Sequence, residues 1–303
     1  AVRSVRSAAM RAPFHGDKAG EDPSHAEQVE ASSSELTHID DDTRAQLIQS
    51  VESLTADSSN VDLNDDTRER ALDDAVRAFK LRVEKYREQS MLLDPMLSSL
   101  IEPLMSRVLE RVALEDAYGG ETEKERQTRR RLHRCCEALD AISSVRGWKV
   151  CVRFYPNDAK NLEPAVRLLS RSRNLVEFGW STRRVFLCWL SILALTPFDL
   201  VSIDSAVDAA EQQIPNVVEE LMHECEHCLG EPGVTRDAAA VTLAKLLTRP
   251  VMSPGRAAFV EWSITALQSD VRDRGAEKFL IPGVLKALSA IYKTGTREVL
   301  LKD

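Results

Sequence analysis

The sequence predicts an all-α protein, and composition and pattern both lead to this prediction. Glycine and proline are sparse, with 12 of each among 303 residues, and aromatic residues make up only 5%. Ala, Leu, Arg and Glu, which favour helices, recur throughout. Helix-length segments with apolar residues three or four apart follow one another between proline or glycine residues. With 43% hydrophobic residues, the chain can bury a substantial core.

The first 42 residues differ from the rest of the chain. They mix Ser, Gly, Pro, His and acidic residues without apolar periodicity, so they cannot bury enough surface to offset the entropy of ordering. We expect residues 1–42 to be a flexible tail and residues 43–303 to form the folded domain. Residues 1–13 contain Arg and Ser but no acid, as transit peptides do. Because the first residue is Ala, we interpret this start as that of a fragment and not as a targeting signal.

The sequence of the first half of the domain predicts four helices. The third follows Pro95, is interrupted by Pro103 and ends near Ala117, and the fourth ends at Gly147. The arginine cluster 129–131 in the fourth is interpreted as a solvated helix face. Residues 148–154 alternate as a strand would, but their helical surroundings favour a short helix that Pro156 ends. The other expected ranges are 43–54, 65–89 and 122–145.

The second half predicts more regular helices joined by short loops, with proline at many junctions. Helix pairs recurring at about 40 to 47 residues are typical of HEAT and armadillo repeats, so we expect an α-solenoid. Residues 234–247 fit the second helix of such a repeat, with Ala at the close contacts, Leu in the core, and Arg236 and Asp237 in a ladder between repeats. The expected ranges are 162–171, 181–195, 204–229, 235–248, 254–269 and 282–293.

Charge and hydropathy exclude two classes of protein. The net charge of −8 argues against a nucleic-acid or anionic-membrane binder, which would present a basic surface. The longest apolar run, residues 185–196, is shorter than the roughly 20 residues that span a bilayer, so it predicts a buried helix. Cys188 lies inside this run, and no secretory signal is visible. We therefore expect the six cysteines to be reduced thiols in the cytosol.

One segment, residues 221–230 (LMHECEHCLG), contains the HExxH pattern of zinc peptidases in His223, Glu224 and His227. On a helical wheel His227 lies about 40° from His223, within a charged stripe that also holds Glu224, whereas Cys225 and Cys228 fall about 200° and 140° away on the apolar side. A catalytic zinc needs a third protein ligand, and no histidine follows His227. We interpret the pattern as a solvated helix face. A zinc hydrolase and a weak surface metal site remain alternatives.

No other catalytic pattern is present: the sequence has no glycine-rich phosphate loop and no GxSxG elbow. We therefore expect a protein that is not an enzyme, has no cofactor, and acts by binding other proteins. A HEAT-repeat adaptor with an unspecified protein cargo is the general form of this hypothesis.

A longer pattern begins 43 residues before His223. It comprises Trp180-Ser-Thr-Arg183 with Trp189-Leu-Ser191, then Pro197-Phe198-Asp199, Arg236-Asp237, Leu247-Thr-Arg249-Pro250, and Glu261-Trp262-Ser263. Residues 285–298 continue it, and upstream pieces at 145–147, 153–156 and 163–164 fit as well. In this order and spacing the chain resembles the tubulin-folding cofactor D family over about residues 135–303. Asn157-Asp158 departs from the His-Glu usual there, and the family has no metal pattern at the LMHECEHCLG segment.

The resemblance implies a HEAT/armadillo solenoid that acts as a tubulin chaperone, of which this chain matches an N-terminal portion. It implies capture of β-tubulin and work with tubulin cofactors E and C and an Arf-like small GTPase in assembling and disassembling the α/β-tubulin heterodimer. Stimulation of GTP hydrolysis would belong to that assembly and occur on tubulin, so no catalytic residue transfers. The implied location is the cytoplasm, with the microtubule cytoskeleton, without nucleic-acid binding or membrane insertion.

The residues of this pattern are expected to be mainly structural. Trp189 lies in the middle of an apolar helix and should be in the core, whereas Trp180 and Arg183 are the residues more able to reach a surface. Asp199, directly after Pro197-Phe198, should cap or brace a turn.

Overall fold

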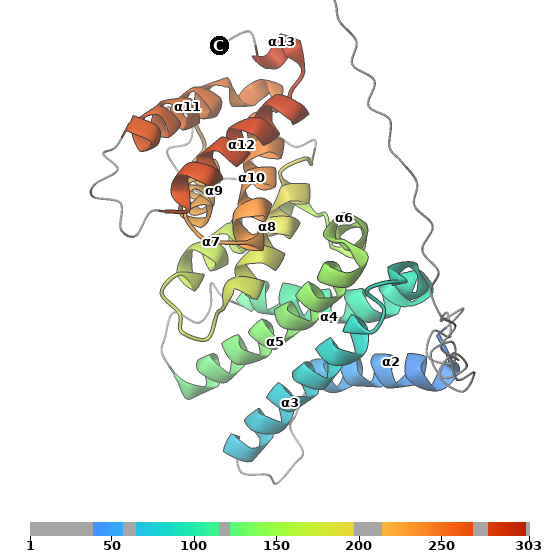
Figure 1. Ribbon diagram of the computed structural model, residues 1–303. Coiled ribbons are helices and arrows are strands. Elements are labelled where there is room, and N and C mark those ends of the chain that lie inside the picture. Colours follow the sequence, from blue (N-terminus) through green and yellow to red (C-terminus); the bar gives the residue numbers. More distant parts are fainter. Residues whose placement is uncertain (1–38, 57–64, 115–121, 197–213, 269–277, 301–303) are drawn as a thin grey trace, which may run out of the picture. The chain divides into compact units, whose positions relative to one another are not determined.

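The part of the chain that the structure describes is helical (Figure 1). The computed structural model describes residues 39–56, 65–114, 122–196, 214–268 and 278–300. Within these ranges every regular element is an α-helix or a short 3₁₀ helix (η), which confirms the all-α prediction. The elements are α2 (Asp41–Thr55), α3 (Asp65–Glu84), η1 (Ser90–Met96), α4 (Leu97–Leu114), α5 (Glu123–Arg146), α6 (Trp148–Cys151), η3 (Val152–Phe154), η4 (Ala159–Asn161), α7 (Leu162–Ser172), α8 (Trp180–Leu193), α9 (Asn216–Leu229), α10 (Val234–Leu247), η6 (Pro250–Met252), α11 (Ser253–Gln268), α12 (Leu280–Thr294) and α13 (Arg297–Leu300).

The longer helices pack as successive pairs: α2 with α3, α4 with α5, α7 with α8, α9 with α10, and α11 with α12. Equivalent helices of neighbouring pairs also pack on each other. The first helices α2, α4, α7 and α9 form one row, and the second helices α3, α5, α8, α10 and α12 form another. Figure 1 shows the pairs following one another in chain order, from blue α2–α3 to red α11–α12. This arrangement confirms the predicted α-solenoid, with α10 as the second helix of its pair.

Local sequence explains where several helices begin and end. Asp40 caps α2 by accepting a hydrogen bond from the Thr43 N–H at 2.7 Å, so this helix begins two residues earlier than predicted. The preceding residues, up to 38, lie outside the described ones. Thr122 and Glu125 form a reciprocal capping box at the start of α5. Gly147, at φ 97°, separates α5 from the short helix predicted at residues 148–154, which the structure confirms as α6 and η3.

Three predicted helix boundaries are wrong. Pro103 does not interrupt its helix but lies inside α4, where burial of the apolar residues around it outweighs the lost hydrogen bond. The helix expected to run to residue 89 ends at Glu84, and turns lead into η1. The helix expected from residue 204 begins only at Asn216, after Pro215, which disfavours helix in the residue before it; residues 204–213 lie outside the described part.

The solvated face predicted for the arginine cluster is also wrong in part. Arg129 is buried, with its Nε 3.5 Å from the Glu177 carboxylate. Arg134, one turn further along, is buried as well. The cause is the position of α5 between α3 and α8 in the second row, with α4 also packed against it, which leaves little of its circumference to solvent.

The helices α9 and α12 approach each other closely at Gly283. A Cβ atom added to this glycine would lie 2.1 Å from the Leu229 carbonyl oxygen, far inside normal contact distance. Gly283 is in the first turn of α12, and Leu229 is the last residue of α9. The absence of a side chain at this position therefore sets how closely the two helices pack.

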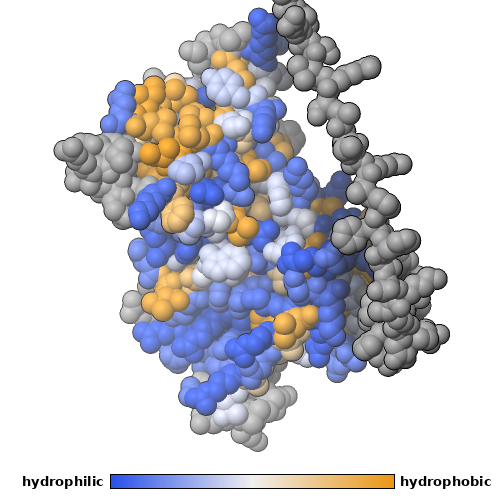
Figure 2. All heavy atoms as spheres, viewed as in Figure 1, coloured by the Kyte–Doolittle hydropathy of each residue, from blue (hydrophilic) through white to orange (hydrophobic). Residues whose placement is uncertain are grey.

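The surface over α11 is unusually apolar for an exposed helix. Figure 2 shows orange, hydrophobic atoms gathered at the upper left, where α11 lies in Figure 1, and Val260 and Ile264 of α11 are among the exposed apolar residues. Among the residues that the structure describes, no helix is long and apolar enough to cross a bilayer. All six cysteines are buried and free.

Candidate functional site

Trp189, at the centre of the sequence pattern, is fully buried in α8 and connects this helix to the segment before α7. Its indole Nε1–H donates to the Pro156 carbonyl at 2.6 Å, and its ring meets Phe186 edge-on with centroids 5.9 Å apart. Leu190 beside it is also buried. Trp180, at the start of α8, is 51% exposed, so the two tryptophans divide between core and surface as the sequence predicts.

Two arginines of the pattern tie neighbouring helix pairs together. Arg249, after α10, donates through Nη1 to the carbonyls of Ala194 and Thr196 at 2.5 and 3.0 Å, which satisfies acceptors at the end of α8. Arg183, in α8, lies 3.0 Å from a carboxylate oxygen of Glu231, after α9. Both contacts link the α7–α8 pair to the α9–α10 pair.

The remaining described residues of the pattern have contacts within their own helices. Trp262 stacks on Phe259 within α11, with centroids 5.5 Å apart, and Pro250 begins η6. Arg236 and Asp237 are neighbours in the first turn of α10, with Arg236 Nε 3.9 Å from Asp237 Oδ1. Pro197, Phe198 and Asp199 lie outside the described residues, so the role predicted for Asp199 stays a prediction.

Polar contacts join the second-row helices at each step, and we call this set the polar ladder. A cation on one helix reaches a carboxylate or hydroxyl oxygen on the helix before it, so each junction fixes the register of the next pair. The contacts are Arg134 to Glu69 and Asp73 (α5 to α3), Arg184 to Asp140 (α8 to α5), Lys245 to Ser191 (α10 to α8), and Lys286 to Asp237 (α12 to α10). The sequence predicted Arg236 and Asp237 in such a ladder: Asp237 takes part through Lys286, whereas the ion pair recorded for Arg236 is with Asp237 of its own helix.

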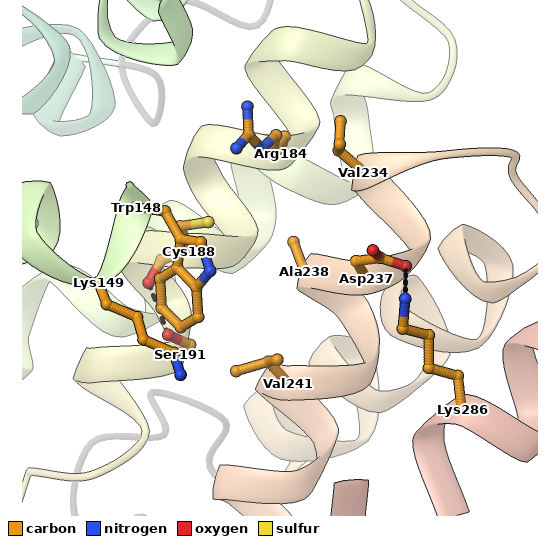
Figure 3. Close-up of a pocket in the computed structure, with 10 residues that line it drawn as sticks. All are labelled: Trp148, Lys149, Arg184, Cys188, Ser191, Val234, Asp237, Ala238, Val241 and Lys286. Atoms are coloured by element: carbon orange, nitrogen blue, oxygen red, sulfur yellow. Dashed lines mark hydrogen bonds and ion pairs between the residues drawn. The ribbon is translucent and has the colours of Figure 1, made fainter. Parts of the chain in front are cut away.

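A hollow of about 340 Å³ opens beside this ladder, and Figure 3 shows it in close-up. We call it the tryptophan pocket, because the Trp148 ring of α6 forms one wall, facing the residues of α10. The lining residues come from four helices: Trp148 and Lys149 (α6), Arg184, Cys188 and Ser191 (α8), Val234, Asp237, Ala238 and Val241 (α10), and Lys286 (α12).

Apolar groups and cations share the tryptophan pocket. Lys149 and Lys245 both place their ammonium groups near the Trp148 ring, at 5.9 and 5.4 Å from its centroid. Cys188 contributes a thiol whose pKa burial raises to about 12, so it stays protonated and behaves as an apolar group. Sequence reasoning missed Trp148 and Lys149, because WKVCVRF suggested only a choice between strand and helix.

The helical repeats match a known protein family. The family model described as Tubulin-specific chaperone D-like, ARM repeat matches residues 83–267, well over half of the chain. The chain belongs to the tubulin-specific chaperone D-like family. The match begins in α3 and ends in α11, so it covers most of both helix rows and the whole tryptophan pocket except Lys286. No solved structure matches the chain.

In this chaperone D-like chain the HExxH histidines and the cysteines lie on different sides of α9, as predicted. His223 and His227 are exposed, and Cys225 and Cys228 are fully buried. The expectation that Glu224 is solvated is wrong: its side chain is buried and lies 2.7 Å from the Arg173 guanidinium. A salt bridge to Arg173, directly after α7, thus holds the carboxylate that a zinc peptidase would use as its base.

Another group of ligand-type side chains comes together at the end of α9. Among the described residues, His227, Cys228 and Glu231 are the three whose ligand atoms lie within 4.8 Å of one another, and His223 is not one of them. Glu231 is already paired with Arg183. Burial raises the pKa of Cys228 to about 12, which opposes formation of the thiolate that binds zinc. The geometry therefore gives the zinc hydrolase hypothesis no support.

Proposed function

We propose that this chain is a tubulin-binding scaffold. In this proposal it captures β-tubulin and takes part in assembling and disassembling the α/β-tubulin heterodimer, together with tubulin cofactors E and C and an Arf-like small GTPase. The observation that supports it most strongly is the chaperone D-like family match across residues 83–267. The proposed location is the cytoplasm, in association with microtubules.

The physical character of the described residues supports action by binding. A stack of helix pairs offers long rows of side chains at fixed spacing, which suits recognition of a folded protein surface. The strongest candidates for chemistry are occupied or unreactive: Glu224 is bound to Arg173, and burial raises the pKa values of the Cys188 and Cys228 thiols to about 12. We propose that the chain has no catalytic centre of its own and that any stimulation of GTP hydrolysis requires the whole assembly.

The test is direct binding by the purified chain. It would be immobilised and exposed in turn to unpolymerised α/β-tubulin and to the Arf-like GTPase loaded with GDP or GTP, with biolayer interferometry as the readout. Saturable binding of tubulin or of the GTPase is the expected result. Retention of neither, combined with recovery of an unrelated protein cargo from extract, would replace the proposal with the general HEAT-repeat adaptor.

A further inference from the structure

We propose that the tryptophan pocket binds an acidic peptide segment of a protein partner, with an apolar side chain seated in the hollow and carboxylates on Lys149 and Lys245. This inference deepens the proposed function, since it rests on the chain being a protein-binding scaffold. It assigns the contact to one surface, between α6, α8 and α10. Nothing in the family match assigns a ligand to this surface.

The shape and lining of the pocket suit one apolar side chain. A hollow of about 340 Å³ lies within the range of roughly 300 to 1,000 Å³ typical of ligand pockets. Val234 of α10, which lines the pocket, is 42% exposed. Burying the exposed part of this apolar side chain would be favourable. Trp148 supplies a rigid aromatic wall opposite (Figure 3). An inserted aliphatic or aromatic group would remove this apolar surface from water.

Within the described part of the chain, two of the four cations around the pocket have no carboxylate partner. Arg184 and Lys286 are neutralised by Asp140 and Asp237. Among the described residues, however, no carboxylate forms an ion pair with Lys149 or Lys245, and Lys245 has only the Ser191 hydroxyl at 3.1 Å and the Trp148 ring as partners.

The two unpaired lysines also disfavour each other. Burial, and to a smaller extent the charge of Lys149, lowers the pKa of Lys245. An incoming carboxylate near the Trp148 ring would attract both ammonium groups and relieve their repulsion. The chain as a whole carries a net charge of −8, so this local positive excess is opposite in sign to the net charge.

A peptide fits these features better than a nucleic acid does. Nucleic-acid binding draws its affinity from many phosphate contacts. Here the described residues offer only two ammonium groups without a carboxylate partner, on Lys149, which lines the pocket, and on Lys245 over the Trp148 ring, and a chain of net negative charge would repel the rest of the backbone. The apolar lining also calls for a nonpolar group beside the anions, which a peptide supplies in adjacent residues. Recognition by an apolar anchor flanked by charges is a common mode of peptide binding.

The experiment uses the purified chain and a fluorescein-labelled synthetic peptide that carries one phenylalanine flanked by glutamates, with fluorescence anisotropy as the readout. We expect saturable binding that weakens as salt is added. Lys149→Glu should weaken it roughly tenfold or more, because it replaces an attractive charge by a repulsive one at an exposed position. The matched control, Lys124→Glu, reverses another exposed lysine, at the start of α5 and not among the pocket-lining residues, and should leave binding unchanged.

Peptide variants separate the two parts of the site. Replacing the phenylalanine by alanine should weaken binding, and replacing the glutamates by lysines should abolish it. Circular dichroism of each protein variant verifies folding. No binding by the unaltered chain, equal loss in Lys149→Glu and Lys124→Glu, or equally tight binding of a single-stranded oligonucleotide that is lost in Lys149→Glu would each overturn the proposal.

Tubulin binding distinguishes failure of this proposal from failure of the proposed function. If Lys149→Glu loses the peptide and also weakens tubulin binding, the pocket is part of the tubulin contact. If the unaltered chain binds tubulin, and Lys149→Glu binds both tubulin and the peptide as tightly as the unaltered chain does, the scaffold function stands and the pocket assignment falls. If the peptide binds through Lys149 but tubulin does not bind at all, the pocket stands and its partner is another acidic protein.

Discussion

Among the glycines that the structure describes, Gly283 is the one where an added methyl group should disturb the solenoid most, because α12 approaches α9 closely there. A Cβ at residue 283 would lie 2.1 Å from the Leu229 carbonyl oxygen and 2.9 Å from its carbonyl carbon. Real Cβ contacts are essentially never under 3.0 Å, so something must shift. Because the opposing atoms are backbone, rotation of a side chain cannot relieve the overlap, and α12 has to move away from α9.

Two effects of Gly283→Ala on stability oppose each other, and their relative sizes decide whether the free energy of unfolding rises or falls. Replacing glycine by alanine in a helix ordinarily stabilises by up to about 1 kcal/mol. Overpacking a tight contact costs about 1 to 3 kcal/mol, and more where the backbone has to separate. Given the depth of this overlap we expect the clash to win, with the free energy of unfolding lowered by about 2 kcal/mol or more.

Gly255→Ala is the matched control. Gly255 is a buried glycine in the first turn of α11, but an added Cβ there would meet only side-chain atoms, Leu247 Cδ2 and Met222 Sδ, both at 3.4 Å. The same substitution should therefore be neutral or slightly stabilising. Urea unfolding monitored by circular dichroism would compare the midpoints of the two variants at unchanged slope. A Gly283→Ala midpoint at or above that of the unaltered chain, or equal losses in both variants, would refute the reasoning.

The other predictions concern a buried ion pair, the two tryptophans of α8 and the thiols. Arg184→Met should cost about 3 to 5 kcal/mol at neutral pH, because it leaves the Asp140 carboxylate buried and unpaired. Burial already raises the pKa of Asp140, and loss of Arg184 raises it further. The stability lost in Arg184→Met should therefore shrink as pH falls toward the ordinary Asp pKa of about 3.9, where the carboxyl becomes protonated. A loss of stability that grows in acid would contradict this. Trp189→Phe leaves the Pro156 carbonyl without its 2.6 Å donor and should cost about 1 to 3 kcal/mol in thermal or urea unfolding, whereas Trp180→Phe should stay within about 0.5 kcal/mol; similar losses would count against the division between core and surface. All six buried cysteines should react slowly with Ellman's reagent in the native chain and rapidly in urea, and fast native reaction of Cys188 would show that its environment is more open than the structure has it.

Sequence reasoning failed at positions where a partner far along the chain decides the outcome. Arg129 and Glu224 are both charged residues on helices with polar stripes, so the sequence predicted solvent for both. Glu177 lies beside Arg129 and Arg173 pairs with Glu224, each from a different helix or loop. Helical periodicity says which residues share a side of one helix, but not how many other helices surround it.

The sequence by itself determined the all-α class, the repeated helix pairs and the family, because composition, apolar period and a long ordered pattern are local properties that need no knowledge of packing. It also separated the histidines from the cysteines on α9, since a helical wheel depends only on residue spacing. The tertiary structure alone decided the close approach at Gly283, the pairing partners in the polar ladder and the tryptophan pocket. Trp148, Cys188, Val234 and Lys286 are up to 138 residues apart in the sequence, and they line one hollow because the second-row helices stack.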